Sequence, residues 1–173
     1  MHNPLLSVFA TPFGTAPFDQ ITNAHYLPAI SQAIKLGKEE IEKIKVGPLP
    51  TFENTIEALD QSGKLLGRIS SIFFNLNSAE TNEEIQKLAR EISPLLTTHG
   101  NDILLDTVLF ERISQVYEQR NKLNLSTEEL TLVEKTYKSF ARNGAKLSGE
   151  QAEELRKIDQ ELAQTSLKFG ENV

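Results

Sequence analysis

The chain has 173 residues, of which 39% are hydrophobic and 24% are charged, and its formal net charge is -6. This length and composition fit one globular domain with a sizeable core and argue against disorder. Basic residues are interleaved with acidic ones, as in KEEIEKIK at residues 38–45, so the basic stripe that nucleic-acid binding needs is missing. The chain has no cysteine, which excludes disulfides, thiolate metal sites and a cysteine nucleophile.

The sequence also contains no membrane or export signal. No apolar run approaches the roughly 20 residues that a membrane-spanning helix needs, and the N-terminus, MHNPLLSVFATPFG, lacks the charged start and long apolar stretch of a signal peptide. Together with the absence of cysteine, this favours a cytoplasmic protein without membrane contact. The periplasm is the alternative if a signal peptide has been removed.

Residues 1–21 are predicted to form an extended N-terminal arm packed on the body of the protein. Proline fixes its own φ and restricts the preceding residue, so a helix is disfavoured. Three prolines interrupt the segment, at Pro4, Pro12 and Pro17. Three phenylalanines are expected to lie buried against the helices that follow, namely Phe9, Phe13 and Phe18.

Residues 22–173 are predicted to form one helical domain, because helix signals repeat from residue 22 onward. Thr22 can cap a first helix that runs to about Val46, where Gly47-Pro48 ends it. Its apolar residues recur at helical spacing and predict one buried face.

A second helix is predicted to begin near Thr51, in the stretch PTFENTIEAL. Apolar residues recur at three- and four-residue steps as far as Leu76. Gly63 and Gly67 lie four residues apart within this helix and indicate a close helix crossing. Asn54 has no role in the pattern. Either its amide bonds the extended arm, or it is an exposed, neutral residue.

The third and fourth helices are predicted from their start signals. TNEE opens the third, with Thr81 and Glu84 as a capping box. Pro94 lies within its apolar run and predicts a kink or break there. Asp106 is expected to cap the fourth helix.

Two more helices complete the pattern. Ser126 with Glu129 is a second capping box, and the helix that follows should break at Asn143-Gly144. Ser148 is expected to cap the last helix. The apolar face of that helix comprises Leu155, Ile158, Leu162 and Phe169. The fold class is therefore all-α: a multi-helix bundle of about six helices with an extended Pro/Phe-rich N-terminal arm.

No catalytic, cofactor-binding or metal-binding residue is predicted in this chain. Enzyme motifs such as H-E-x-x-H, G-x-S-x-G and a Gly-rich phosphate loop are missing. The three histidines have no second histidine four residues on, and a metal site needs several converging ligands. His99 falls in step with an apolar face and His25 lies at a helix start. Both are interpreted as packed, hydrogen-bonded histidines, with a ligand or phosphorelay role as the alternative.

Two further patterns are assigned structural roles. Glu83 and Glu84 are adjacent, so on a helix their side chains diverge by about 100° and cannot form a tight acidic pair. They are better explained as favourable charge at a helix N-terminus. Asn124 to Ser126 matches a glycosylation sequon, but Ser126 is better used as a helix cap.

Several stretches, taken in order, carry a resemblance to a known family. They are TPFGTAPFDQITNAHYLPAI, PTFENTIEALDQSGKLLGRISSIFFNLNSAETN, EISPLLTTHGNDI, LFERISQVY, FARNGAKL and LAQTSLKFGENV. From about residue 3 to the end, the chain resembles the N-terminal region of the zinc oligopeptidases of the thimet oligopeptidase and neurolysin family. Within that family it looks most like the bacterial peptidyl-dipeptidase Dcp, with oligopeptidase A next.

The resemblance implies a role within a larger zinc enzyme. Members of the family are large helical peptidases in which a narrow channel admits short peptides. Their zinc is held by the two histidines of H-E-x-x-H and a later glutamate, and the glutamate within the motif activates water. That motif lies beyond the region matched here. The chain is therefore expected to be a non-catalytic N-terminal domain that forms part of the channel wall. Its partners would be the C-terminal catalytic part and short peptide substrates.

This interpretation predicts that the chain alone binds no zinc and hydrolyses no peptide, and that zinc belongs to the full-length parent. The alternative is a free-standing helical protein-interaction module without enzymatic activity. A domain of a larger protein should expose an apolar patch where the missing part packs. Nucleic-acid binding is a third, disfavoured class that a steep loss of affinity with salt would reveal.

Overall fold

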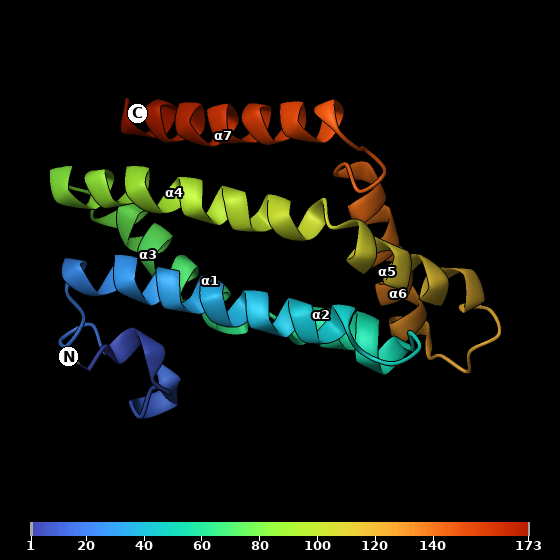
Figure 1. The fold of residues 1–173 in the computed structure, drawn as a ribbon. Helices are drawn as coiled ribbons and strands as arrows, with labels where there is room; N and C mark the ends of the chain where they lie inside the picture. Colours follow the sequence, from blue (N-terminus) through green and yellow to red (C-terminus); the bar gives the residue numbers. More distant parts are fainter. Residues whose placement is uncertain (1, 173) are drawn as a thin grey trace. The chain divides into compact units, whose positions relative to one another are not determined.

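The computed structural model describes residues 2–172, and within that range the chain is helical and has no strand (Figure 1). The predicted all-α bundle of about six helices is confirmed. The six longer helices are α1 (Asn23–Lys45), α3 (Lys64–Ala79), α4 (Glu83–Leu104), α5 (Thr107–Gln119), α6 (Thr127–Arg142) and α7 (Glu150–Glu171). The shorter elements are the 3₁₀ turns η1 (Pro4–Leu6) and η2 (Pro12–Gly14), the π-helix η3 (Phe52–Glu57) and the four-residue α2 (Ala58–Gln61). None of the helices within 2–172 has the length and apolar character needed to cross a membrane.

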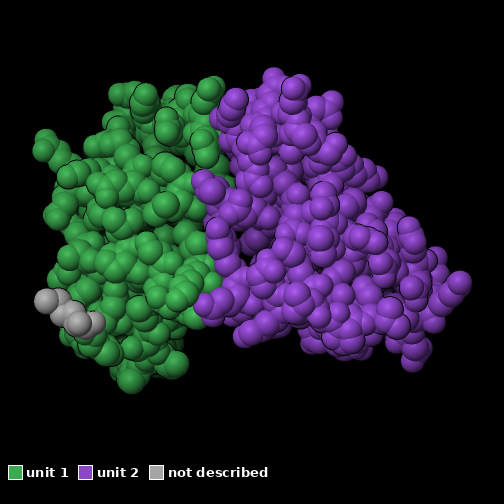
Figure 2. Space-filling view, in the orientation of Figure 1, with its two compact units in different colours: residues 1–37, 63–97, 160–173 green, residues 38–62, 98–159 purple. Residues whose placement is uncertain are grey.

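The chain divides into two compact units, which are coloured separately in Figure 2. Unit 1 consists of residues 1–37, 63–97 and 160–173, and unit 2 of residues 38–62 and 98–159. Helices α1, α4 and α7 each contribute residues to both units. Each unit has a hydrophobic core of its own.

The core of unit 1 is built from the arm, the first part of α1, α3 and the first part of α4. Tyr26 and Phe73 meet at its centre with ring centroids 5.0 Å apart. Such tilted aromatic pairs add to the free energy gained from burying the rings. The buried members are Leu5, Tyr26, Ala29, Ile30, Ala33, Ile69, Phe73, Ile85, Ala89 and Ile92.

The core of unit 2 joins the end of α1, η3, α5 and α6. At its edge, Tyr117 and Tyr137 stack with centroids 3.9 Å apart, and Phe110 stacks on Tyr137 at 5.5 Å. The buried members are Ile41, Ile44, Phe52, Ile56, Leu109, Ile113, Val116, Val133, Phe140 and Ala145.

The phenylalanines of the N-terminal segment do not all behave as predicted. Phe9 is partly buried beneath the guanidinium of Arg68, which lies 4.3 Å from the ring centroid. Phe13 and Phe18 are exposed, so the expectation that both are buried is wrong. The prolines divide this segment into short turns, and a turn has no helical periodicity that would return every aromatic side chain to the core.

The predicted second helix is interrupted. Ser62 is extended and Gly63 is left-handed, with φ +67°, so η3 and α2 end there and α3 begins at Lys64. A left-handed residue cannot continue a right-handed helix, and glycine adopts this conformation at low cost. The expected close helix crossing is also wrong, because a Cβ placed on Gly63 or Gly67 would meet no atom within 4 Å.

The start of α4 differs from its prediction. Asn82 rather than Thr81 caps the helix, since its side-chain oxygen accepts the backbone N–H of Ile85 at 3.0 Å. Glu84 instead accepts a hydrogen bond from Asn23 of α1. The helix also runs unbroken through Pro94, so the alternative of a break there is wrong.

Other predicted helix signals are confirmed. Asp106 accepts the backbone N–H of Leu109 at 2.8 Å, and the Ser126–Glu129 capping box forms with both reciprocal bonds. The helix break at residues 143–144 occurs where Gly144 has φ +97°. A Cβ on this glycine would also lie 2.5 Å from a methyl carbon of Leu155.

Candidate functional site

His2 and His25 have local structural roles. His25 Nδ1 accepts the backbone N–H of Thr22 at 3.0 Å, and this bond satisfies a free donor at the start of α1. His2 lies 3.1 Å from the hydroxyl of Ser7. No group of three or more histidine, aspartate and glutamate side chains within 2–172 is arranged to hold a metal ion.

His99 lies on α4 and is only 5% exposed, which confirms the prediction of a packed histidine. Its Nδ1 atom is buried and has no hydrogen-bond partner in the described part of the chain, so the predicted hydrogen bond at that atom is absent. Burial lowers the pKa of His99, and the charge of Lys38 lowers it further, while Asp102 acts in the opposite direction. Burial therefore favours the neutral form of the His99 imidazole over the charged form.

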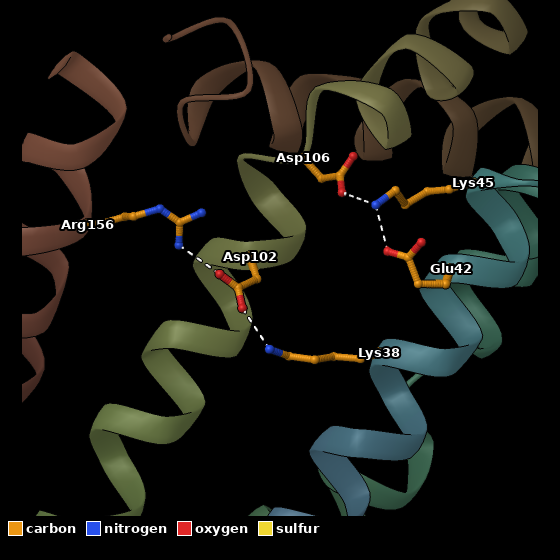
Figure 3. A network of polar contacts seen from close by, with 6 residues as sticks. All are labelled: Lys38, Glu42, Lys45, Asp102, Asp106 and Arg156. Atoms are coloured by element: carbon orange, nitrogen blue, oxygen red, sulfur yellow. Dashed lines mark hydrogen bonds and ion pairs between the residues drawn. The ribbon is translucent and has the colours of Figure 1, made fainter. Parts of the chain in front are cut away.

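A network of six charged residues in unit 2 is drawn in Figure 3, and four of its members line one cavity together with this histidine. The Asp102 carboxylate accepts hydrogen bonds from Lys38 of α1 and Arg156 of α7, each at 2.9 Å. Burial opposes ionisation of Asp102, but the hydrogen bonds and charges of these two cations outweigh it and lower the pKa of the carboxyl group. One carboxylate thus links three helices within unit 2.

A second carboxylate, that of Asp106, lies just beyond the end of α4, where it caps the N-terminus of α5. The ammonium of Lys45 contacts Asp106 at 2.8 Å and Glu42 at 2.6 Å. Hydrogen bonds to Asp106 and then to Glu42 raise the pKa of Lys45. Asp106 also caps α5 through Leu109, so its two oxygens serve different elements.

A cavity of about 360 Å³ opens between these groups. The acids of the network are paired with lysine or arginine, and no hydroxyl or thiol nucleophile lines the cavity beside His99. The lining residues are Lys38, Ile41, Glu42, His99, Asp102, Ile103 and Asp106. This arrangement can hold α1, α4 and α7 together within unit 2, but it offers no nucleophile–base pair for acyl transfer.

Asn54 fits neither of the two roles considered for it. Its side-chain oxygen accepts the N–H of Thr51 at 2.9 Å, its amide donates to the carbonyl of Leu49 at 2.9 Å, and the hydroxyl of Thr51 accepts its backbone N–H at 3.2 Å. Asn54 therefore closes a capping box and ties the preceding loop to η3. It bonds no residue of the arm.

Arg112 is the buried charged side chain within residues 2–172, and the sequence patterns did not single it out. It is 8% exposed and donates to the carbonyls of Gly47 and Pro48 at 3.1 and 2.8 Å. Helical spacing could have predicted its burial, because Arg112 lies three residues after Leu109 and four before Val116, on the buried face of α5.

Helix α7 carries an apolar face that the described residues leave uncovered. None of its residues is buried. Of the predicted face, Leu155 is half-buried, whereas Ile158, Leu162 and Phe169 are 52%, 62% and 71% exposed. Large exposed apolar side chains at helical spacing indicate a surface that a partner covers.

Comparison with known proteins identifies relatives along the whole chain. It is 38% identical over 172 residues, or 99% of its length, to dipeptidyl carboxypeptidase of Escherichia coli (strain K12). It is 26% identical over its full length to oligopeptidase A of the same organism, and 30% identical over 71% of its length to a thimet-like oligopeptidase of Dictyostelium discoideum. The chain is an oligopeptidase relative. This confirms the resemblance, and no family model matches the chain.

The extent of the match differs between this chain and its relatives. This chain spans only about a quarter of the length of the dipeptidyl carboxypeptidase and of oligopeptidase A. It corresponds to a fragment or domain of such a peptidase.

Proposed function

We propose that this chain is the N-terminal, non-catalytic helical domain of a longer zinc-dependent peptidyl-dipeptidase or oligopeptidase that hydrolyses short peptides. The observation that carries the proposal is the 38% identity along 99% of the chain, matched to only a quarter of a dipeptidyl carboxypeptidase. By this proposal the remaining three quarters form the C-terminal catalytic part, and the protein works in the cytoplasm.

The exposed face of α7 supports this assignment. A domain that normally packs against more protein exposes apolar residues when described alone. Ile158, Leu162 and Phe169 meet that expectation. We propose that this face contacts the catalytic part and that the domain forms part of the wall of a substrate channel.

Zinc would be bound outside the described residues. Within 2–172 no set of histidine and carboxylate side chains fits the three protein ligands of a catalytic zinc site. We therefore derive no zinc chemistry from this chain, and assign the metal to the rest of the longer polypeptide.

The test begins with the gene. A reading frame that continues beyond the codon for Val173 and encodes H-E-x-x-H with a downstream glutamate is the expected result. The longer polypeptide should then release dipeptides or shorter fragments from short peptides and lose this activity with a zinc chelator. The 173-residue chain, purified free of contaminating proteases, should show none. A stop codon directly after Val173 would instead favour a free-standing interaction module.

A further inference from the structure

The N-terminal segment presents an uncharged apolar surface in unit 1. Residues 3–18 contain no charged side chain, and the first lysine or arginine of the chain is Lys35. Four large apolar side chains in this segment are exposed, and we call them the arm patch: Leu6 at 37%, Val8 at 89%, Phe13 at 103% and Phe18 at 57%. Phe13 makes no contribution to the described core, because its ring is fully in solvent.

Phe13 also has an unfavourable backbone conformation. Its φ and ψ are +60° and 13°, and no other non-glycine residue within 2–172 has a positive φ. Side-chain-bearing residues adopt the left-handed region at a cost, because Cβ approaches the following carbonyl oxygen. Glycine would adopt it freely, as Gly14 does at φ +67°. The phenyl ring therefore does not stabilise the turn that carries it.

Hydrogen bonds hold this turn closed. The N–H of Gly14 donates to the carbonyl of Thr11 at 3.0 Å, and the hydroxyl of Thr15 donates to the carbonyl of Pro12 at 3.2 Å. The hydroxyl of Thr11 in turn donates to the carbonyl of Thr15. These bonds fix the backbone of the turn and hence the direction of the Phe13 Cα–Cβ bond, which reduces the entropy that a contact with a partner would cost.

The turn follows a segment that is fixed to the body of unit 1. Leu5 is fully buried. The guanidinium of Arg68 donates to the carbonyls of Leu5 and Ser7 at 2.9 Å each, and the amide of Asn3 donates to the carbonyl of His25 at 2.8 Å. The arm patch is therefore displayed from an anchored segment.

Charge and area restrict what can cover the arm patch. Binding to a lipid surface draws on lysine and arginine, and this segment has neither. A stable dimer buries about 800 Å² on each partner, whereas a buried aromatic residue contributes about 150–250 Å². One fully exposed phenylalanine and three partly covered side chains fall short of that area. A contact within one polypeptide needs less, because the tether supplies a high effective concentration.

We propose that Phe13 is an anchor, carried on a preorganised turn, that inserts into an uncharged apolar pocket on the remainder of the longer polypeptide. This inference rests on the part of the proposed function that assigns the chain to a longer protein. Phe13 is a docking point separate from the apolar face of α7.

The test compares Phe13→Gly with Phe13→Ala in two proteins, the 173-residue chain and the longer polypeptide. In the 173-residue chain, Phe13→Gly should raise the folding equilibrium constant about fivefold or more, because the left-handed conformation is relieved and no contact is lost. Phe13→Ala keeps the unfavourable φ and should leave that constant unchanged. In the longer polypeptide, Phe13→Ala should lower the urea midpoint, and Phe13→Gly should offset part or all of that loss.

Amide hydrogen exchange gives a second measurement. Exchange at residues 8–18 should be slower in the longer polypeptide than in the 173-residue chain, and Phe13→Ala should remove that protection. The inference is overturned if Phe13→Ala leaves the stability and exchange of the longer polypeptide unchanged, or if the reading frame stops after Val173. It is also overturned if the 173-residue chain dimerises in sedimentation experiments and Phe13→Ala abolishes the dimer.

Peptidase activity separates the two proposals. If the longer polypeptide cleaves peptides but its stability does not change with Phe13→Ala, the proposed function stands and the docking point is wrong. If Phe13→Ala lowers the stability of the longer polypeptide but that polypeptide cleaves no peptide, the docking point stands and the proposed peptidase function is wrong.

Discussion

In each unit, an arginine from a helix holds a proline-containing segment in place through hydrogen bonds. The two units differ in what else holds that segment. In unit 1, Arg68 of α3 donates to the carbonyls of Leu5 and Ser7 and covers the ring of Phe9. In unit 2, Arg112 of α5 donates to the carbonyls of Gly47 and Pro48. The segment in unit 2 has a further support, because the Asn54 capping box also bonds the carbonyl of Leu49.

The comparison indicates that the effect of losing one arginine depends on how the segment it holds is connected to helices. The loop of residues 46–51 has a helix at each end, α1 before it and η3 after it. Within residues 2–172, the arm contains only the three-residue turns η1 and η2, and the long helix that it joins is α1. Loss of Arg68 should therefore free a segment locally, whereas loss of Arg112 should leave the carbonyls of Gly47 and Pro48 without this donor in a loop that is held at both ends. Four measurements can break or sharpen this comparison.

The largest effect is expected for Arg112→Ala. Hydrogen bonds to charged groups contribute about 1.5–3 kcal/mol each, and the substitution removes two, to the carbonyls of Gly47 and Pro48. We expect the free energy of unfolding to fall by about 3 kcal/mol, as measured by urea denaturation. Arg112→Lys keeps the charge but loses the planar fork, and should recover less than half of the loss. A variant as stable as the wild type would show that the loop does not depend on this arginine.

Arg68→Ala should cost less and act locally. We expect a loss of about 1–2 kcal/mol, because this guanidinium is more exposed and the arm can leave the body. Chymotrypsin should cleave at the phenylalanines of the arm much faster than in the wild type, while α5 and α6 stay protected. Equal cleavage rates would mean that Leu5 and Asn3 hold the arm without the arginine.

Asn54→Ala tests the extra support in unit 2. The amide closes a capping box and bonds the carbonyl of Leu49, so we expect a loss of about 1–2 kcal/mol in thermal or urea unfolding. Asn82→Ala is the matched control, since Asn82 caps α4 through a single bond and should cost about 1 kcal/mol. A smaller loss for Asn54→Ala than for Asn82→Ala would contradict the role assigned to the capping box.

The smallest expected effect concerns the pH dependence of unit 2. An accessible histidine in the unfolded chain titrates near a pKa of about 6.5, and burial lowers the pKa of His99 in the folded chain. Between these two values the unfolded chain binds more protons, so the free energy of unfolding falls as pH decreases and levels off below the folded-state pKa. His99→Gln should reduce this slope between pH 7 and pH 5. Identical slopes in urea unfolding would show that His99 is not responsible.

Local signals predicted much of the helical framework because they act between residues close in the chain. The Asp106 cap and the Ser126–Glu129 box each depend on atoms three residues apart. The same reasoning missed the interruption at Gly63, because an apolar pattern that continues across a glycine does not reveal its φ. It also assigned the α4 cap to Thr81, although the neighbouring Asn82 carries an equally good capping group.

The candidate sites were less predictable than the helices. Helical spacing placed His99 on a buried face, but it did not reveal the pairing of Asp102 with Lys38 and Arg156, which are 64 and 54 residues away in sequence. The spacing of apolar residues predicted an apolar face on α7, but spacing alone does not show whether other residues cover that face.

The sequence by itself determined the helical class, most helix ends and the kinship with oligopeptidases, because periodicity, caps and ordered motifs are carried by near neighbours in the chain. Only the tertiary structure decided which side chains are buried, paired or left in solvent. Phe9, Phe13 and Phe18 illustrate this limit, since the three rings are similar in sequence context but only Phe9 lies beneath an arginine. Burial depends on which distant segments meet, and that information is not local.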